Sequence, residues 1–300
     1  MKIRNLLITA IAIPLLTTSL SALSEHTWVS GIGNDSNPGT QTLPYATFAT
    51  AVANTSPGGL VSVADTGDFG PVTISNSITI DGGGIGGTIT FTGSEGIYIF
   101  SSTACTVSLR HLTINGLGIG TDAIFFASNS GINNNNLIID GCTLEGFTDI
   151  GIGVGSESGE NVVVKDTTII GGTLGFRVFQ GVGPDQCNLR NVTIQGATSA
   201  AIFTRSGELD VSNSDLAQNL IALENDTSAT ITAENCMISC NGTGVATYSG
   251  SVTRLSNNDI IKNQTGIASD GGLVLSTGTN VKGGNAGGVV PVASPSNLLF

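Results

Sequence analysis

Apolar and polar positions follow one short pattern that the chain repeats from residue 188 to residue 262. Each copy is centred on one residue, which we call the anchor. The positions four and two before the anchor, and one and three after it, are mostly apolar. The anchors are His111, Gly141, Asp166, Asn191, Asn213, Asn235 and Asn258. They recur at a nearly fixed period of roughly two dozen positions, and such a period predicts a stacked repeat architecture.

The pattern also predicts what each repeat contains. Alternation breaks between the position two before the anchor and the position one after it, which indicates a bend between two strands whose side chains both point inward. A third strand begins about ten residues later, for example at 201–204 and 244–247. Strand, bend, strand, turn, strand and turn within one such period form one coil of a parallel β-helix. The predicted fold class is therefore an all-β, single-stranded parallel β-helix, or solenoid.

The asparagines among the anchors suggest how the bend is held. We expect Asn191, Asn213, Asn235 and Asn258 to stack as a ladder, each side-chain amide bonded to the next. Asparagine also tolerates the left-handed backbone conformation that such bends need. Two other repeat folds fit less well, because a propeller needs four strands in about 40 residues and leucine-rich repeats need a denser leucine frame.

The chain divides into three predicted parts. Residues 1–24 have the pattern of a signal peptide, with Lys2 and Arg4, an apolar stretch at 6–16 and small residues before a cleavage point after about Ser24. Residues 25–70 predict an N-terminal strand and a short helix opened by Pro44, which caps the apolar end of the first coil. Residues 71–300 predict the β-helix and a C-terminal closing segment. We expect a secreted or periplasmic protein that does not insert into a membrane after cleavage, since no later stretch is long and apolar enough.

Composition supports this picture and excludes some partners. Only 11% of the residues are charged, whereas ordinary domains have roughly 25% charged residues. Together with the 42 glycines, this is typical of a β-rich chain with many turns. The net charge of −12 argues against nucleic acid as a partner. Of the five cysteines, Cys142 and Cys236 share a column but lie roughly 19 Å apart, beyond disulfide reach. We expect free, mostly buried thiols and no metal site.

One stretch carries a family resemblance. Residues 28–40, Trp-Val-Ser-Gly-Ile-Gly-Asn-Asp-Ser-Asn-Pro-Gly-Thr, and the following 44–48, Pro-Tyr-Ala-Thr-Phe, resemble the N-terminal module of secreted bacterial right-handed parallel β-helix proteins, the pectate-lyase-like group. This resemblance implies a right-handed helix and a polysaccharide partner. The chain lacks the group's catalytic motifs: neither the aspartate cluster of a lyase calcium site nor the Asn-Thr-Asp, Asp-Asp, Gly-His-Gly and Arg-Ile-Lys series of polygalacturonase-like hydrolases is present. Fold analogy alone does not confer chemistry.

The outward positions of the third strands carry the candidate site. Exposed aromatic rings stack on sugar faces, and charged groups between them bind hydroxyls or uronates. The predicted substrate-binding residues are Phe125, Arg177, Phe179, Phe203, Arg205 and Tyr248. The catalytic candidates are Arg177, Arg205, Glu224 and Asp226, with an arginine as the base of a lyase or the two carboxylates as the pair of a hydrolase. The competing interpretation is a set of ordinary surface ion pairs.

Three functions stay open at this point. The first is a secreted protein that interacts with an extended polysaccharide or other glycan along one coil face. The second is a polysaccharide lyase or glycoside hydrolase, and only a lyase would need Ca²⁺; otherwise we expect no cofactor. The third is a non-catalytic structural or adhesive surface protein. The oligomeric state is left open.

Overall fold

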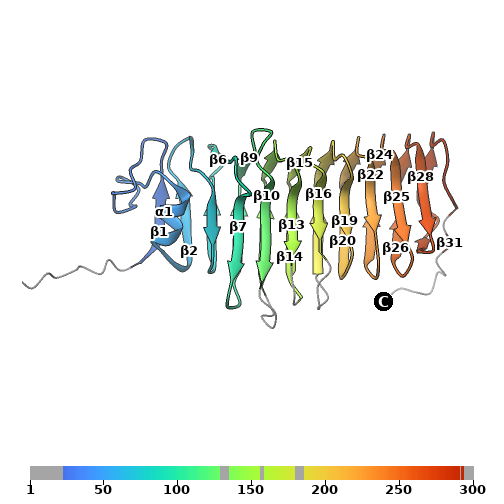
Figure 1. The fold of residues 1–300 in the computed structure, drawn as a ribbon, viewed down its shortest axis with the longest axis horizontal. Helices are drawn as coiled ribbons and strands as arrows, with labels where there is room; N and C mark the ends of the chain where they lie inside the picture. The colour runs from blue at the N-terminus through green and yellow to red at the C-terminus, as the bar shows by residue number, and fades with distance from the viewer. Residues whose placement is uncertain (1–22, 129–134, 156–158, 180–185, 291, 294–300) are drawn as a thin grey trace, which may run out of the picture.

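The computed structural model describes residues 23–128, 135–155, 159–179, 186–290 and 292–293. The chain winds into an elongated stack of coils along one axis (Figure 1). Over the described ranges the strands form three parallel sheets of twelve, nine and ten strands, and each full coil contributes one strand to each sheet. The predicted all-β parallel β-helix is therefore confirmed.

The three sheets account for nearly all of the regular structure. The twelve-stranded sheet contains β1 (Ser24–Val29), β2 (Thr55–Val63), β5 (Ile78–Asp81), β8 (Thr106–Arg110), β11 (Asn136–Asp140), β14 (Asn161–Lys165), β17 (Gln186–Arg190), β20 (Glu208–Ser212), β23 (Thr230–Glu234), β26 (Val252–Ser256), β29 (Leu273–Ser276) and β31 (Val292–Ala293). The nine-stranded sheet contains β4 (Val72–Ile74), β7 (Glu95–Ser101), β10 (Asp122–Ser128), β13 (Ile150–Gly155), β16 (Leu174–Val178), β19 (Ala200–Thr204), β22 (Ile221–Asn225), β25 (Thr243–Tyr248) and β28 (Thr265–Asp270). The ten-stranded sheet contains β3 (Gly67–Asp68), β6 (Gly87–Thr90), β9 (Leu112–Asn115), β12 (Thr143–Glu145), β15 (Thr168–Ile170), β18 (Thr193–Gln195), β21 (Asp215–Ala217), β24 (Met237–Ser239), β27 (Asp259–Ile261) and β30 (Val281–Gly283).

The core consists of apolar columns that run along the axis. Pairing in register places Ile124, Ile152 and Phe176 above one another, and all three are fully buried. Burying one such side chain contributes roughly 2–3 kcal/mol. Because a shift of one residue would turn every inward side chain outward, these columns fix the register of each coil on the next.

The anchor residues form the predicted row at the first corner, with one correction. Asn191, Asn213 and Asn235 have left-handed φ angles of 51° to 54°, and backbone hydrogen bonds join each to the coil that follows. In the last repeat the left-handed residue is Asn257 (φ 54°), so the anchor assigned to Asn258 was wrong. Ser256 pairs with Glu234, which brings Asn257 level with Asn235. The last four members of the row, from Asn191 to Asn257, are then evenly spaced along the chain.

The predicted amide ladder along this row was also wrong. These asparagine side chains are exposed, because a left-handed residue at a tight corner points its side chain toward solvent. Between members of the row in the described part of the chain, one inter-coil bond is formed, from Asn191 Nδ2 to Asp166 Oδ1 at 2.6 Å. The exposed row therefore depends on the left-handed tolerance of asparagine. Beside it at the same corner, Asn258 is fully buried, and its Nδ2 donates to Asn280 Oδ1 of the next coil at 2.9 Å, so of the four predicted amides only that of Asn258 is stacked.

An interior ladder lies instead at the corner between the ten-stranded and the nine-stranded sheets. Its rungs are Asn219, Asn241, Asn263 and Asn285, one in each successive coil. The Oδ1 of Asn241 accepts the backbone N–H of Asn219 at 2.8 Å and its Nδ2 donates to the carbonyl of Leu216 at 2.9 Å. Asn263 repeats this arrangement one coil later. The amides of Asn219, Asn241 and Asn263 are thus buried but satisfied, as buried polar groups must be.

The N-terminal cap follows the prediction. Helix α1 (Phe48–Ala53) begins after Thr47, whose side chain accepts the N–H of Thr50, and it buries Phe48, Ala51 and Val52. The Phe48 ring packs 5.0 Å from the ring of Phe69. Pro44, where the helix was expected to open, lies four residues before its first turn. Residues 1–22 of the predicted signal peptide lie outside the described residues, and Ser24 is the first residue of β1.

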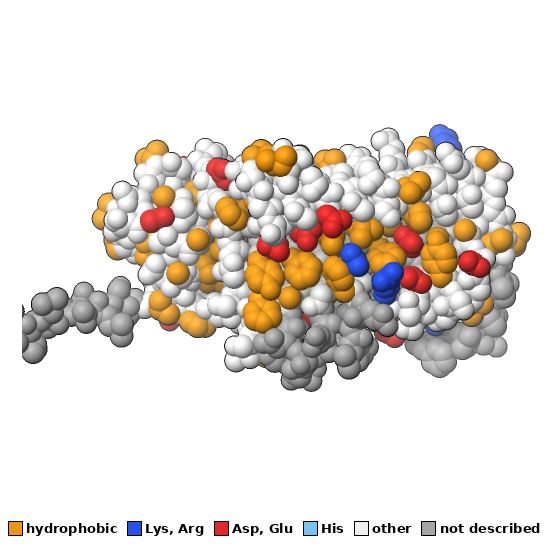
Figure 2. Space-filling view, viewed as in Figure 1, with side chains coloured by type: hydrophobic (Ala, Val, Ile, Leu, Met, Phe, Trp, Pro, Cys, Tyr) orange, Lys and Arg blue, Asp and Glu red, His pale blue; other side chains and the backbone are white. Residues whose placement is uncertain are grey.

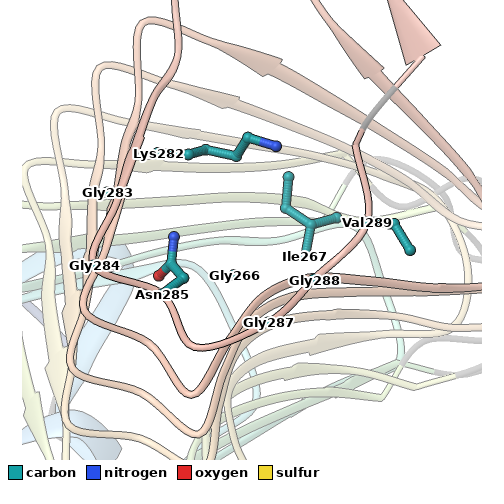
Figure 3. A pocket seen from close by; sticks show the side chains of 9 residues that line it. All are labelled: Gly266, Ile267, Lys282, Gly283, Gly284, Asn285, Gly287, Gly288 and Val289. Atoms are coloured by element: carbon teal, nitrogen blue, oxygen red, sulfur yellow. The ribbon is translucent and has the colours of Figure 1, made fainter.

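At the C-terminal end the last coil is glycine-rich. Figure 3 shows the side chains of Ile267, Lys282, Asn285 and Val289 around a hollow of about 260 Å³. The predicted closing segment contributes β31 here, and its residues 291 and 294–300 lie outside the described residues. Among the helices described, none is long and apolar enough to span a membrane.

The cysteines are free thiols, as predicted. Four of them, Cys105, Cys142, Cys187 and Cys236, are buried, and Cys240 is exposed. Burial raises the pKa of Cys142 and of Cys236 to about 11. These two side chains therefore behave as small neutral core residues.

The interior ladder generates a stability prediction. Asn241→Ala should lower the free energy of unfolding by about 3 kcal/mol, because it leaves the buried N–H of Asn219 and the carbonyl of Leu216 without partners. Urea unfolding followed by circular dichroism measures this. Asn213→Gly is the control at the exposed corner, where glycine adopts the left-handed φ freely, and it should change stability by less than about 0.5 kcal/mol. Equal losses in the two variants would contradict the assignment.

Candidate functional site

The candidate residues lie on the outer face of the nine-stranded sheet, which we call the outer face. Register pairing puts Tyr98, Phe125, Gly153, Arg177, Phe203 and Glu224 in one outward column. A second outward column, two residues further along each strand, contains Phe100, Gly155, Phe179, Arg205, Asp226, Tyr248 and Asp270. The structure therefore brings all the predicted site residues onto one face, but the Phe203 ring, which was expected to be exposed, is buried beneath its neighbours. Their role in binding stays a prediction.

Five aromatic rings on this face, which we call the aromatic row, are Tyr98, Phe100, Phe125, Phe179 and Phe203. The Tyr98 ring lies 6.1 Å from that of Phe100 and 6.2 Å from that of Phe125. Phe125 and Phe179 meet edge to face at 5.6 Å. Such contacts contribute about 0.5–1.5 kcal/mol beyond area burial. In Figure 2 apolar side chains gather in the middle of this face, with acidic side chains along one side.

Two glycines make the aromatic row continuous. Phe125 and Phe179 come from β10 and from the residue after β16, and β13 lies between these two strands. A Cβ on Gly153 would lie 2.9 Å from the Phe125 ring, and a Cβ on Gly155 would lie 3.0 Å from it. The two rings therefore lean over the glycines of β13 and touch across that strand.

The two arginines continue the row toward the C-terminus. The guanidinium carbon of Arg177 lies 3.8 Å from the Phe179 ring centre and 5.7 Å from that of Phe203. The guanidinium carbon of Arg205 lies 5.2 Å from the Phe203 ring centre, and its Nε pairs with Asp226 Oδ2 at 3.2 Å. Contacts between cations and aromatic faces contribute about 0.5–2 kcal/mol. They hold both guanidinium groups against the sheet.

Arg177 is the less solvated of the two arginines. Burial, followed by the charge of Arg205, lowers its pKa from the ordinary value, although Asp149 and Asp122 oppose this. Its Nε is buried and has no hydrogen-bond partner among the described residues. An unsatisfied guanidinium N–H is a strong donor for an oxygen of a bound molecule.

The predicted acidic pair lies next to Arg205. Burial, and after it the charge of Asp226, raises the pKa of Glu224 above its ordinary value, and Arg205 opposes this. Burial raises the pKa of Tyr248, with Glu224 and Asp226 adding to the effect. Asp226 itself is engaged by Arg205. Glu224 lies on β22 and Asp226 directly after it, so one carboxyl stands in each outward column of the same coil.

Sequence reasoning missed an acidic edge at the start of the third strands, formed by Glu95, Asp122 and Asp149. Asp122 pairs in register with Glu95, and the N–H of Asp149 donates to the carbonyl of Thr121. Burial raises the pKa of Asp122 to about 6; Asp149 and Glu95 add to the rise, while the N–H of Ile150 and the charge of Arg177 oppose it. The available signal was the even spacing of these three acidic residues along the chain.

The same edge becomes apolar in later coils. Ile150, Leu174, Ala200 and Ile221 follow Asp122 in register. With Phe203, which is 8% exposed, and Phe179 they form a second hydrophobic cluster outside the coil interior. The outer face is therefore acidic beside the N-terminal rings and apolar beside the arginines. In the ranges that the structure describes, no group of three or more His, Cys, Asp or Glu side chains converges as a metal site.

Comparisons with known proteins bear on the fold. Residues 179–298 match the family model described as "Right handed beta helix region". The crystal structure of pectate lyase Pel9A is similar, with a TM-score of 0.57, 14% sequence identity, and coverage of 90% of this chain and 78% of that chain. The chain is a right-handed parallel β-helix protein with a pectate-lyase-like fold. No curated protein matches it. The right-handed β-helix and the pectate-lyase-like fold that the resemblance implied are confirmed. The low sequence identity means that the likeness shows the fold alone.

The raised pKa of Asp122 generates a prediction about stability in this β-helix protein. Its pKa is about 6 in the folded protein against an ordinary value of 3.8, so the folded state binds its proton more tightly. Stability should therefore fall as pH rises through this window. Asp122→Asn, which can still accept from Ile150 N–H, should be more stable than the parent by about 1 kcal/mol at neutral pH, allowing for partial exposure.

The measurement is the urea midpoint of both proteins across acidic and neutral pH. At pH well below the ordinary value the two should have equal stability, because the parent carboxyl is then protonated in both states. A stability difference that does not change with pH would contradict the assignment.

Proposed function

We propose that this protein binds an extended polysaccharide along the outer face of the nine-stranded sheet. The observation that carries the proposal is the continuous row of planar groups, from Tyr98 through Phe125 and Phe179 to Arg177 and Phe203. Aromatic faces are the side-chain surfaces that match the apolar faces of sugar rings. The pectate-lyase-like fold supports the same class of ligand.

The spacing of the row also suits a polymer. Adjacent strands lie about 4.8 Å apart, comparable to the length of one sugar ring in an extended chain. A glycan lying parallel to the axis would thus present about one ring to each coil. Arg177 and Arg205 are placed to donate hydrogen bonds to ring substituents, and the Nε of Arg177 has no other partner among the described residues.

Export fits this ligand class, and we propose it on the signal-peptide pattern of residues 1–24. Extended polysaccharides are components of cell walls and matrices, which an exported protein meets. N-terminal sequencing of the protein recovered from its host would check this: a mature chain beginning near Glu25 is expected, and a chain beginning at Met1 would contradict it.

A catalytic version is the second candidate. The observation in its favour is that two carboxyls on or beside the outer face, Asp122 and Glu224, keep their protons to higher pH than usual, as general acids do. Cleavage would appear as new reducing ends for a hydrolase, or as unsaturated-sugar absorbance for a lyase, with and without added calcium. Binding without either signal would select the non-catalytic protein.

A binding experiment tests the main proposal. Phe179→Ala and Arg177→Gln should each weaken retention on the best-bound member of a polysaccharide panel by about tenfold or more, which corresponds to about 1.4 kcal/mol, because each interrupts the row. Affinity electrophoresis in polysaccharide-containing gels gives the retardation directly.

Arg254→Gln is the matched control. Arg254 is exposed on β26 of the twelve-stranded sheet, so its loss changes the net charge equally without touching the outer face. It should leave retardation unchanged, and all variants should unfold at similar urea concentrations. If the whole panel fails to retard the parent protein, or if Arg254→Gln has the same effect as Arg177→Gln, the outer face is not the binding surface. The structural or adhesive function would then be preferred.

A further inference from the structure

We propose that the N-terminal end of the outer face is a subsite for an amino sugar. A hexosamine ring would stack on Tyr98, with its ammonium group facing Glu95 and the acidic edge. This inference rests on the proposed function, because it names the class of glycan that the outer face selects. The two arginines alone would suggest a different glycan, a polyuronate.

A hollow marks this subsite at the end of the aromatic row. It measures about 350 Å³ and is lined by Ala49, Pro71, Val72, Thr73, Glu95 and Tyr98. Thr73 is the register partner of Tyr98 on the neighbouring strand β4. Ala49 belongs to the capping helix α1, so the cap closes this end of the row. A site with one aromatic face, one hydroxyl and one carboxylate at the end of a row can hold a single sugar ring.

The aromatic row fixes the ring that would carry the sugar. Tyr98 lies nearly parallel to Phe100, with 4° between the planes, and within 27° of Phe125. Two neighbouring rings therefore limit its rotation. A sugar bound on Tyr98 would continue onto Phe125, so the hollow and the row form one track.

Charge decides which sugar the track prefers. The ion pairs of the described residues join Asp140 to Lys165 and Asp226 to Arg205, and His111 contacts Asp81. None of them includes the acidic edge, Glu95, Asp122 and Asp149. Arg177 is the cation that interacts with Asp122 and Asp149. It lies on β16, one coil from Asp149 but three coils from Glu95 on β7, or roughly 14 Å at the usual strand spacing. Three acidic residues therefore share one nearby cation, and Glu95 beside the hollow is the farthest from it.

A polyuronate would meet repulsion along most of this face. The face carries two arginines, Arg177 and Arg205, and a larger number of carboxylates, those of Glu95, Asp122, Asp149, Glu224, Asp226 and Asp270. A polymer with one carboxylate per sugar would place several of its charges beside these acids, and like charges at short range are unfavourable. Ammonium groups at the acidic edge would instead form charge-assisted hydrogen bonds.

The experiment compares three soluble hexamers by isothermal titration calorimetry at one pH: glucosamine, N-acetylglucosamine and galacturonic acid. The glucosamine hexamer should bind at least tenfold more tightly than its acetylated counterpart, and the galacturonic acid hexamer should bind most weakly. The double variant Glu95→Gln/Asp149→Asn should remove most of the preference for the free amine. Within the described part of the chain, the side chains of Glu95 and Asp149 accept no hydrogen bond, so the double variant should leave the fold intact. Tyr98→Ala should weaken both hexosamines.

The matched control is Asp210→Asn/Glu234→Gln, which removes the same two charges from exposed positions of the twelve-stranded sheet. It should leave all three affinities unchanged. Equal effects of the two double variants would show non-specific attraction of a cation to an acidic protein and would overturn the subsite. Equal binding of the two hexosamines, or tighter binding of the galacturonic acid hexamer, would overturn it while leaving the proposed polysaccharide function intact. Binding of no glycan at all would remove both.

Discussion

The structure depends on the register between neighbouring coils, and in the C-terminal coils buried asparagine amides help to fix that register. Each interior asparagine must find a donor and acceptors out of reach of water, and the neighbouring coils supply most of them. Asn219, Asn241 and Asn263 bond in this way to the next rung. A shift of one coil against the next at this corner would leave these groups unpaired, so in these coils the register is fixed by the amides as well as by the apolar columns. In the earlier coils, which carry the aromatic row, the apolar columns align one coil on the next.

Alignment turns a repetitive sequence into chemically distinct surfaces. Rings and arginines lie together on the outer face of the nine-stranded sheet because residues at the same register position in successive coils are neighbours in space. Glu95 and Asp122 of its acidic edge occupy the same register position as Ile150 and Leu174 of its apolar cluster in later coils. A solenoid therefore varies its surface along one axis without altering its core, and a polymer running along that axis meets each change in turn.

The architecture could be predicted well from the sequence, and the errors have local causes. The period and the break in alternation were sufficient for the coil, and the left-handed corner followed from asparagine. The anchor at Asn258 was wrong by one residue because Asn257 and Asn258 are adjacent and both fit a loose pattern. The ladder was predicted on the exposed row because that row lies inside the alternating pattern, whereas Asn219 and Asn241 lie in turns outside it. The acidic edge was missed because it precedes the alternating part of the strand, where inward and outward positions are hard to assign.

The glycines of β13 have a consequence for how the outer face would meet a ligand. Because rings from either side touch over them, the surface is already packed before anything binds. The guanidinium of Arg177 is likewise seated on Phe179. Little rotamer freedom then remains to be lost on association, and this loss normally opposes affinity. The outer face therefore acts as a rigid template with a fixed spacing between coils, and the conformational entropy lost on binding is mainly that of the polymer.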